Sequence, residues 1–351
     1  MVAKRAQRLS RNAVTMYEVA SFAGVSPMTV SRVLSGTAKV RAETRQRVQS
    51  AIAQLNYSPN IAARNLARAR NLHIGLLYNN PSAAYLNEFL VGVLERSRDA
   101  GCQIVLEKCA SNNQQNAIRK LVNDGVDGII LPPPLSDSGR VLQVLRSVGL
   151  PFVEVATGAP ALPGLSVSID DAEAAAAMTR HLVSLGHQKI GFILGASNQT
   201  TSRERYAGFQ SALREAGLGA RPEWVRKGAF TYRSGLLAAE EILNSTARPT
   251  AIFASNDDMA AGAIAVAHRL QLTVPGQLAI AGFDDTPLAS TIWPTLTTIH
   301  QPIAAMARRA VEILLEEIRL RRQGKTQIPL REVFKFSLVE RESTGSRQRK
   351  R

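Results

Sequence analysis

The first 55 residues place apolar side chains at the spacing of short amphipathic helices. Apolar positions recur three and four residues apart in 16–23, 27–34 and 42–55, which predicts three helices. Gly24 falls where a tight turn needs a positive φ, Ser26 can cap the second helix, and Pro27 suits its first turn. The pattern predicts a helix-turn-helix with a core of Val19, Ala20, Ala23, Val30, Val33 and Leu34.

The second predicted helix keeps hydroxyl, small and arginine side chains on its outer side. Such a surface suits the major groove of DNA, and it comprises Ser26, Pro27, Met28, Thr29, Ser31 and Arg32. The alternative interpretation is an ordinary helical hairpin. The charge distribution favours DNA, because residues 1–70 hold twelve lysines and arginines against two acidic residues. They therefore carry +10 of the chain's net charge of +15, which predicts binding to phosphates.

A short segment, 58–67, follows this basic unit. Ser58 can cap a helix there and Pro59 can begin one. A helix of this length is not stable alone, so we expect it to fold only when docked, with Leu66 wedged into a base step of the minor groove. A simple linker explains the same residues equally well.

From Leu72 onward the pattern changes to short apolar runs that alternate with amphipathic stretches. This alternation is typical of buried parallel strands connected by helices. About 280 residues exceed one comfortable α/β core, so we expect two lobes. The predicted strands are 73–78, 102–107, 127–132, 151–155, 165–169, 189–194, 250–254 and 278–283, with a last one near 334–339.

Polar side chains follow three of these strands, at the ends where ligands bind in α/β folds. Arg203 comes after strand 189–194, Asn256 after 250–254, and Asp284 after 278–283. An arginine, a carboxamide and a carboxylate that converge on a cleft can hold a polyhydroxylated or anionic small molecule. Taken singly, each motif is equally typical of a helix cap or a turn.

The sequence predicts no cofactor and no metal. Cys102 and Cys109 lie in or beside a buried strand without a pairing signature, and the five histidines lack ligand spacing, with His300 alone a candidate neighbour of a ligand. Phosphate-loop and dinucleotide motifs are absent from the sequence. It shows no apolar signal core and no apolar run of the ~18 residues that a membrane span needs. We therefore expect a cytoplasmic protein with no membrane partner.

Six segments together resemble the lactose/galactose repressor family of bacterial transcription regulators. They occur in the family's order over about residues 16–340, and they read YEVASFAGVSPMTVSRVLSG, LNYSPNIAARNLA, HLVSLGHQKIGFI, RPTAIFASNDDMAAGA, VPGQLAIAGFDDTPLA and PTLTTIHQP. The resemblance implies an all-α helix-turn-helix head with a hinge helix, followed by a two-lobed α/β effector domain similar to periplasmic sugar-binding proteins. Three crossings between the lobes are then expected near 156–170, 284–290 and 298–302.

The resemblance also implies site residues. It places base contacts on Pro27, Met28 and Arg32, and phosphate contacts on Ser26, Thr29 and Ser31. The remaining DNA-binding positions lie in the region of the hinge and are Tyr57, Asn60, Ala63 and Leu66. The effector positions are Tyr85, Leu86, Arg203, Phe230, Asn256 and Asp284. Ala156 stands where the family commonly has an acid, so an acceptor for a sugar hydroxyl is missing there and the ligand class stays open.

The sequence thus predicts a repressor that binds a pseudo-palindromic operator as a homodimer and responds to a small molecule, expected to be a sugar. Two other classes are disfavoured: a transporter's solute-binding protein has no use for the basic head, and a glycosidase using Asp257 and Asp284 would need an acid in an apolar pocket. Whether the effector releases or promotes DNA binding stays open.

The sequence also predicts the domain organisation. The predicted parts are a basic tail 1–14, a DNA-binding domain 15–57, a hinge and linker 58–71, an effector and dimerisation domain 72–340, and a basic tail 341–351.

Overall fold

The chain divides into two compact units, residues 1–71 and residues 72–351. The computed structural model describes residues 16–35, 40–55, 72–158 and 164–345. The division falls at Leu72, the residue at which the sequence pattern changes from helical periodicity to alternating strands and helices.

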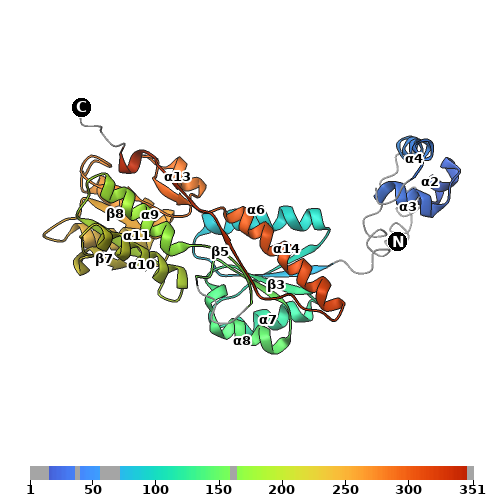
Figure 1. The fold of residues 1–351 in the computed structure, drawn as a ribbon, viewed down its shortest axis with the longest axis horizontal. Coiled ribbons are helices and arrows are strands. Elements are labelled where there is room, and N and C mark those ends of the chain that lie inside the picture. Colours follow the sequence, from blue (N-terminus) through green and yellow to red (C-terminus); the bar gives the residue numbers. More distant parts are fainter. Residues whose placement is uncertain (1–15, 36–39, 56–71, 159–163, 346–351) are drawn as a thin grey trace, which may run out of the picture. The chain divides into compact units, whose positions relative to one another are not determined.

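The described residues of the smaller unit form three helices around an apolar core (Figure 1). The helices are α2 (Met16–Ala23), α3 (Pro27–Ser35) and α4 (Ala42–Gln54). One valine from each helix is fully buried in the core: Val19, Val30 and Val48. Gly24 has a φ of 62° in the turn between α2 and α3, and Ser26 Oγ accepts a hydrogen bond from the backbone N–H of Thr29 at 3.2 Å. The predicted helix-turn-helix is confirmed.

The larger unit begins with a lobe built on a six-stranded parallel sheet, in the order β11-β5-β4-β3-β1-β2. Its strands are β1 (His73–Tyr78), β2 (Gln103–Lys108), β3 (Gly128–Leu131), β4 (Phe152–Val155), β5 (Leu165–Ile169) and β11 (Leu330–Phe334). Helices cover both faces (Figure 1), which explains why β3 and β5 are buried along their whole length. These helices are α6 (Ala83–Ala100), α7 (Gln114–Asn123), the 3-10 turn η1 (Leu135–Asp137), α8 (Gly139–Val148) and α14 (Ile303–Arg322).

The second lobe is built on a four-stranded parallel sheet, in the order β7-β6-β8-β9. Its strands are β6 (Ile190–Leu194), β7 (Val225–Lys227), β8 (Ala251–Ala254) and β9 (Ala279–Ala281). Helix α9 packs on α10, and α11 packs on α12. The helical segments are α9 (Asp171–Ser184), α10 (Thr200–Glu215), η2 (Pro222–Trp224), α11 (Tyr232–Leu243), α12 (Asp257–Arg269) and α13 (Pro287–Thr291).

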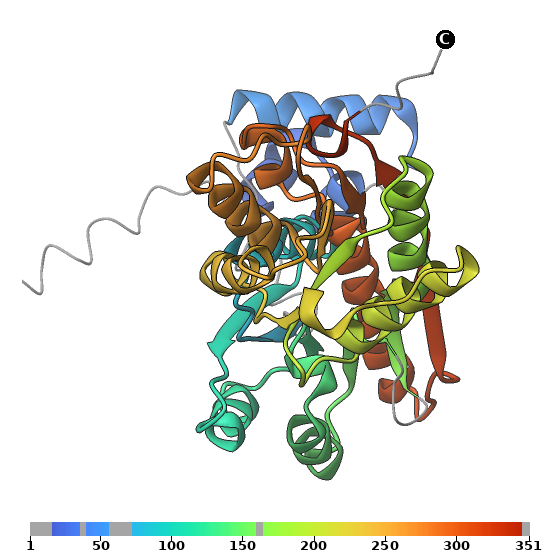
Figure 2. The ribbon, with the colours of Figure 1, turned by 90° about the vertical axis from the view of Figure 1, so that its left-hand side faces the viewer.

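The chain passes between the lobes at three places (Figure 1), and Figure 2 views the same ribbon from the side of the second lobe. It crosses from β5 to α9 near residue 170, from β10 (Thr298–His300) to α14 near 301, and from β11 to β12 (Ser337–Val339) near 335. Strands β10 and β12 pair antiparallel beside the crossings. A final 3-10 turn, η3 (Glu342–Thr344), contacts β9 of the second lobe.

Three details of the predicted fold were wrong. Segment 284–290 is not a crossing, because it leads into α13 of the second lobe. The run predicted near 334–339 is the end of one strand and a second strand, which belong to different sheets. The C-terminal tail does not begin at 341, because η3 is anchored by a hydrogen bond from Ser343 Oγ to the carbonyl oxygen of Ile280 at 2.6 Å.

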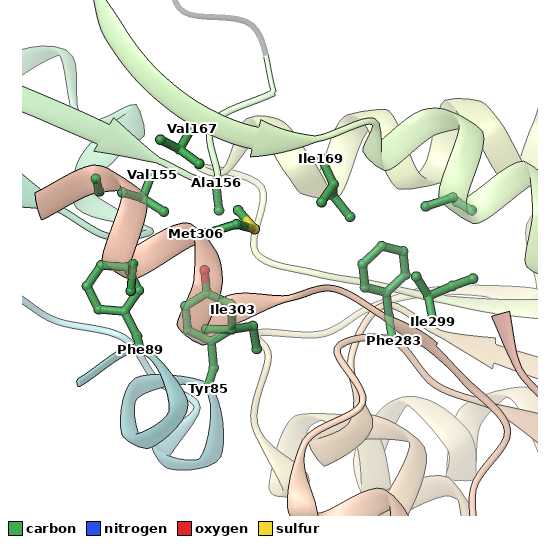
Figure 3. Packing of buried hydrophobic residues seen from close by; sticks show 14 of the residues in the cluster. Tyr85, Phe89, Val155, Ala156, Val167, Ile169, Phe283, Ile299, Ile303 and Met306 are labelled. Atoms are coloured by element: carbon green, nitrogen blue, oxygen red, sulfur yellow. The ribbon is translucent and has the colours of Figure 1, made fainter. Parts of the chain in front are cut away.

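An apolar cluster joins the two lobes at the crossings (Figure 3). Tyr85 of α6 and Met306 of α14 come from the first lobe, while Phe283 follows β9 of the second. Ile169 and Ile299 lie on two of the crossing segments and are buried in the same cluster. Because this cluster is continuous, the two lobes share one apolar core at their junction.

The contact between α9 and α10 leaves no space for a side chain at Gly208. A Cβ there would lie 1.9 Å from the carbonyl oxygen of Ala172. We expect Gly208→Ala to lower the free energy of unfolding by about 1–3 kcal/mol, because two helix backbones must separate. Gly139→Ala at the start of α8 meets no atom within 4 Å and is the matched control. Urea unfolding of the full chain measures both, and equal midpoints would contradict the packing described.

Candidate functional site

The exposed side of α3 is the first candidate site. Met28 is 63% exposed and Arg32 is exposed, whereas Val30 between them is fully buried. Pro27 and Thr29 are half-buried and Ser26 caps the helix, so it is Met28 and Arg32 that project most fully from α3. Ser31 lies within α3, but its side chain is outside the described part. Tyr57, Asn60, Ala63 and Leu66 also lie outside the described residues.

Helix α2 adds two exposed aromatic side chains that the sequence analysis did not select. Tyr17 is 73% exposed and Phe22 is 57% exposed. Their side chains fall off the buried stripe formed by Val19, Ala20 and Ala23. The periodicity of α2 could have identified both, since neither belongs to its apolar face.

The second candidate site is a pocket between the two lobes of the larger unit. About 350 Å³ of space, including its open mouth, is enclosed by residues from both lobes. The first lobe contributes Asn80, Ser82, Tyr85, Pro133 and Ala156, and the second contributes Gln199, Thr201, Arg205, Phe230, Asn256 and Asp284. Most of these residues lie at or just beyond the carboxyl ends of strands, where α/β folds bind ligands. We call this space the inner pocket.

Arg205 of α10 is the charged centre of the inner pocket. Its Nε donates to Asp171 Oδ1 at 2.7 Å and its Nη1 donates to the carbonyl oxygen of Ser255 at 2.6 Å. The guanidinium lies 3.6 Å from the centroid of the Phe283 ring, and its Nη1 is 3.6 Å from Asp284 Oδ1. Only 4% of Arg205 is exposed. The cation is therefore neutralised by two carboxylates before any ligand arrives.

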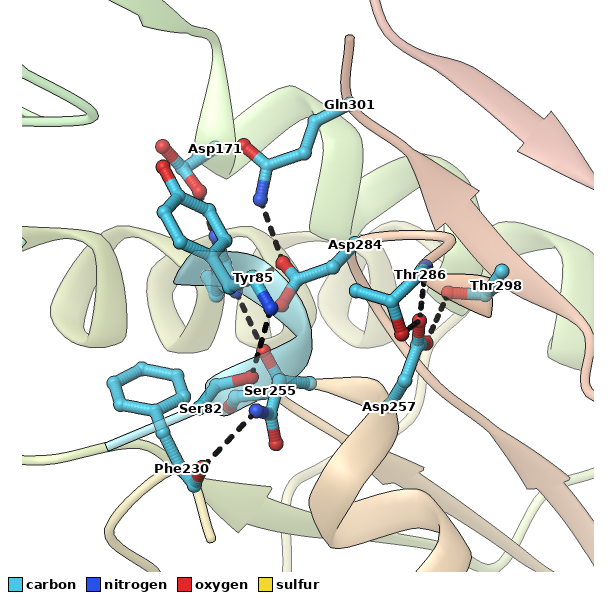
Figure 4. A network of polar contacts seen from close by, with 12 residues as sticks. Ser82, Tyr85, Asp171, Phe230, Ser255, Asp257, Asp284, Thr286, Thr298 and Gln301 are labelled. Atoms are coloured by element: carbon cyan, nitrogen blue, oxygen red, sulfur yellow. Dashed lines mark hydrogen bonds and ion pairs between the residues drawn. The ribbon is translucent and has the colours of Figure 1, made fainter. Parts of the chain in front are cut away.

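Asp284 follows β9 and presents its carboxylate to the inner pocket (Figure 4). Gln301 Nε2 donates to Asp284 Oδ1 at 2.6 Å. Burial raises the pKa of Asp284 well above its usual range, the nearby Asp257 raises it further, and Arg205 opposes both. Asp257 itself is turned away and accepts bonds from Thr286 and Thr298. Asp257 thus ties the first turn of α12 to the start of α13 and to β10.

Three lining residues have a backbone conformation that side chains rarely adopt. The φ angles are 51° for Ala156, 59° for Phe230 and 112° for Asp284. Each follows a strand and turns the chain so that its side chain borders the inner pocket. Strained backbone of this kind concentrates at ligand sites and is maintained by the surrounding structure.

Phe230 is held against the end of β6 by contacts on two sides. A Cβ at Gly195 would lie 1.9 Å from Cζ of the Phe230 ring, so only glycine leaves room for the ring there. Asn256 Nδ2 donates to the Phe230 carbonyl oxygen at 3.2 Å, while its Oδ1 accepts from the backbone N–H of Met259. Asn256 therefore positions Phe230 and caps α12 in addition to lining the inner pocket.

Tyr85 closes the inner pocket from the first lobe. Its hydroxyl is buried and has no hydrogen-bond partner among the described residues. Burial raises the pKa of Tyr85 above its ordinary value, and the charge of Asp284 adds to the shift, so the hydroxyl stays protonated. A buried, protonated and unpaired hydroxyl at a pocket wall is available to bond a ligand.

Four of the six predicted effector positions line the inner pocket: Tyr85, Phe230, Asn256 and Asp284. Arg203 does not, because it is exposed on α10, and Arg205 two residues later takes the place predicted for it. Leu86 lines a neighbouring outer pocket, which shares Asn80 and Gln199 with the inner one. The sequence analysis also missed Gln199 and Thr201, which no motif marked.

The remaining predicted chemistry lies outside the inner pocket. His300 Nδ1 is 3.0 Å from Asp285 Oδ2, and Asp285 also pairs with Arg341 at 2.6 Å. Within the described residues, no group of three or more His, Cys, Asp or Glu side chains is placed to hold a metal ion. The helices of the described ranges include none that is long and apolar enough to cross a membrane.

Comparison with known proteins finds one family model that matches within each unit. Residues 15–60 match the family described as bacterial regulatory proteins, lacI family, and residues 179–344 match a periplasmic binding protein-like domain. The HTH-type transcriptional repressor PurR of Haemophilus influenzae (strain PittEE) is 37% identical over 321 residues, which cover 89% of this chain and 94% of that protein. The chain belongs to the lacI family. It is a DNA-binding transcriptional repressor of that family and not an enzyme.

Other lacI-family proteins agree over nearly the whole length. PurR of Pectobacterium carotovorum subsp. carotovorum (strain PC1) is 36% identical over 94% of this chain and 97% of its own. The transcriptional regulator CelR in complex with cellobiose has a TM-score of 0.72 and 30% identity, over 94% of this chain and 99% of that one. The Lac repressor dimer bound to operator and the anti-inducer ONPF gives the same score and identity, over 95% and 100%. The expected fold class is confirmed.

Replacement of the buried Arg205 should destabilise the protein, and replacement of the exposed Arg203 on the same helix is the matched control. Arg205→Ala leaves Asp171 and Asp284 buried without their cation, so we expect the free energy of unfolding to fall by about 3–5 kcal/mol. Arg203→Ala removes the same side chain from the surface of the same helix and should change it by less than about 0.5 kcal/mol. Denaturant unfolding of both variants distinguishes these outcomes; similar losses would mean that the pairing in the pocket does not stabilise the lobe.

Proposed function

We propose that this repressor binds a pseudo-palindromic operator as a homodimer and is controlled by a neutral carbohydrate bound in the inner pocket. Arg32 and Met28 read base edges from α3, with Pro27 beside them, while Ser26, Thr29 and Ser31 contact phosphates. Tyr57, Asn60, Ala63 and Leu66 complete the DNA-binding surface. A protein that binds chromosomal DNA acts in the cytoplasm.

The exposed residues of α3 and the charge of the N-terminal unit support the DNA part of the proposal. A recognition helix needs a buried side that fixes its position and an exposed side of mixed polarity. In α3 these are Val30 on one side and Met28 and Arg32 on the other. A single head contacts few base pairs, so two heads on a symmetric site give useful specificity. The Lac repressor, similar over 95% of this chain, is a dimer bound to operator.

The charge of the inner pocket supports a neutral ligand. Among the described residues that line it, Arg205 is the cation, and Asp171 and Asp284 already balance its charge. An anionic ligand would find no unpaired cation among these lining residues, whereas a sugar hydroxyl can donate to Asp284 and accept from Thr201 or Gln199. The rings of Tyr85 and Phe230 offer apolar surface to the C–H side of a sugar ring.

The missing acid at Ala156 is compatible with this ligand class. Asp284 supplies a carboxylate and the amide side chains of Asn80 and Gln199 supply further acceptors in the same pocket. The outer pocket begins at these two residues, so a ligand longer than one ring can extend into it. The similar CelR structure is a complex with the disaccharide cellobiose.

If Arg32 reads a base, its replacement should reduce the discrimination between DNA sequences rather than abolish DNA binding. The operator is first selected from a random DNA pool with the full-length protein. Arg32→Ala should then weaken operator binding by about 1–3 kcal/mol and relax the preference at one base pair per half-site, while affinity for random DNA changes little. Quantitative binding titrations on operator variants measure this. Unchanged preference at every position would show that Arg32 does not read a base.

The ligand part predicts that Tyr85→Phe weakens binding without loss of stability. The hydroxyl has no partner in the described part of the protein, so removing it leaves nothing buried unpaired. A panel of mono- and disaccharides, sugar acids and nucleobases is screened by thermal shift, and each hit is titrated calorimetrically. We expect a neutral carbohydrate hit whose affinity falls about 2- to 15-fold in the variant. Hits confined to sugar acids or nucleobases would overturn the proposed ligand class.

A further inference from the structure

Helix α10 of the second lobe is capped by a residue of the first lobe. Its N-cap residue, Gln199, makes no side-chain hydrogen bond to the helix. Instead, Asp137 Oδ2 in η1 accepts from the backbone N–H of Thr200 at 2.8 Å. Thr200 Oγ1 donates to Asp137 Oδ1, also at 2.8 Å. A carboxylate at a helix N-terminus interacts favourably with the exposed N–H groups and with the helix dipole.

The strand end beside η1 holds this carboxylate in place. Thr157 Oγ1 donates to Asp137 Oδ1 at 2.8 Å, and the backbone N–H of Gly158 donates to Thr200 Oγ1 at 2.8 Å. Both residues follow β4 of the first lobe. Asp137 does not line the inner pocket, whereas the residues on either side of Thr200, Gln199 and Thr201, do. The capped residue therefore lies between two residues of the pocket wall.

A second contact joins the lobes at another pair of helix ends. Ser82, the N-cap of α6, donates its hydroxyl hydrogen to Asp258 Oδ2 in the first turn of α12. Ser82 lines the inner pocket, and so does Asn256, which also donates to Asp258. Among the described residues, these two contacts provide the side-chain hydrogen bonds that join the lobes away from the crossing segments.

We propose that Asp137 is a latch residue that holds the lobes closed by capping α10 from the opposite lobe, and that it thereby positions Gln199 and Thr201 in the inner pocket. Opening the lobes removes the only side-chain cap that the start of α10 has in the described structure, so opening carries a free-energy cost that is independent of the ligand's identity. The latch sets the fraction of closed protein, and ligand affinity follows that fraction. This inference does not depend on the ligand class proposed above.

Hydrogen exchange of the ligand-free full-length protein tests the latch at the amide of Thr200. Asp137→Ala should speed exchange at this amide by about 2- to 30-fold, the range expected for loss of a helix cap. Asp137→Asn keeps an oxygen that can accept from Thr200 N–H and should retain most of the protection. Asp124→Ala, at an exposed position at the end of α7 in the same lobe, is the matched control and should leave the rate unchanged.

A variant at the contact between Ser82 and Asp258 tests whether Asp137 holds the lobes closed or only caps α10. Asp258→Ala removes the bond to Ser82 and leaves Asp137 intact, so it should also speed exchange at Thr200 if both contacts hold the same closed state. Urea unfolding shows whether each variant keeps the fold. Faster exchange in Asp137→Ala alone, with Thr200 unaffected in Asp258→Ala, would make Asp137 a local cap and overturn the proposal. Unchanged exchange in Asp137→Ala would also overturn it.

Discussion

The buried guanidinium of Arg205 is the interaction on which the effector site depends. One side chain bonds Asp171 at the start of α9 and the backbone after β8, and it lies over the ring of Phe283 after β9. It thus connects three segments that leave different strands and fixes the carboxyl edge of the second sheet. Because its charge is already balanced by Asp171 and Asp284, the pocket combines rigid polar walls with little attraction for anions.

The sequence predicted where helices and strands lie along the chain far better than it predicted which residues come together in the fold. The buried strands of both lobes are continuous apolar runs, so their pattern located them, whereas β7 is the short polar sequence Val225-Arg226-Lys227 and gave no such signal. Arg203 and Arg205 illustrate the same limit within the site. They lie two residues apart on one helix and point in different directions, and only the position of α10 against β8 and β9 determines which enters the pocket.

Ala156, which stands where the family commonly has an acid, lies in the same region of the lobe interface as Asp137. Ala156 follows β4 with a positive φ and contributes only a methyl group to the pocket. The next residue, Thr157, donates to Asp137, which reaches the opposite lobe from η1. The negative charge at the start of α10 therefore comes from Asp137 of the other lobe. The sequence could not predict this contact, because no pattern in η1 indicates a neighbour in another lobe.

The place of β11 in the first sheet has a consequence for how the chain folds during synthesis. β11 pairs with β5, and α14 packs against that sheet, although the whole second lobe separates them from β5 in the sequence. On the ribosome, the edge of β5 and the sheet face that α14 covers stay exposed until more than 150 further residues have been translated. The sheet of the first lobe is thus completed after the sheet of the second, and β5 remains an unpaired strand edge for several seconds at ordinary elongation rates.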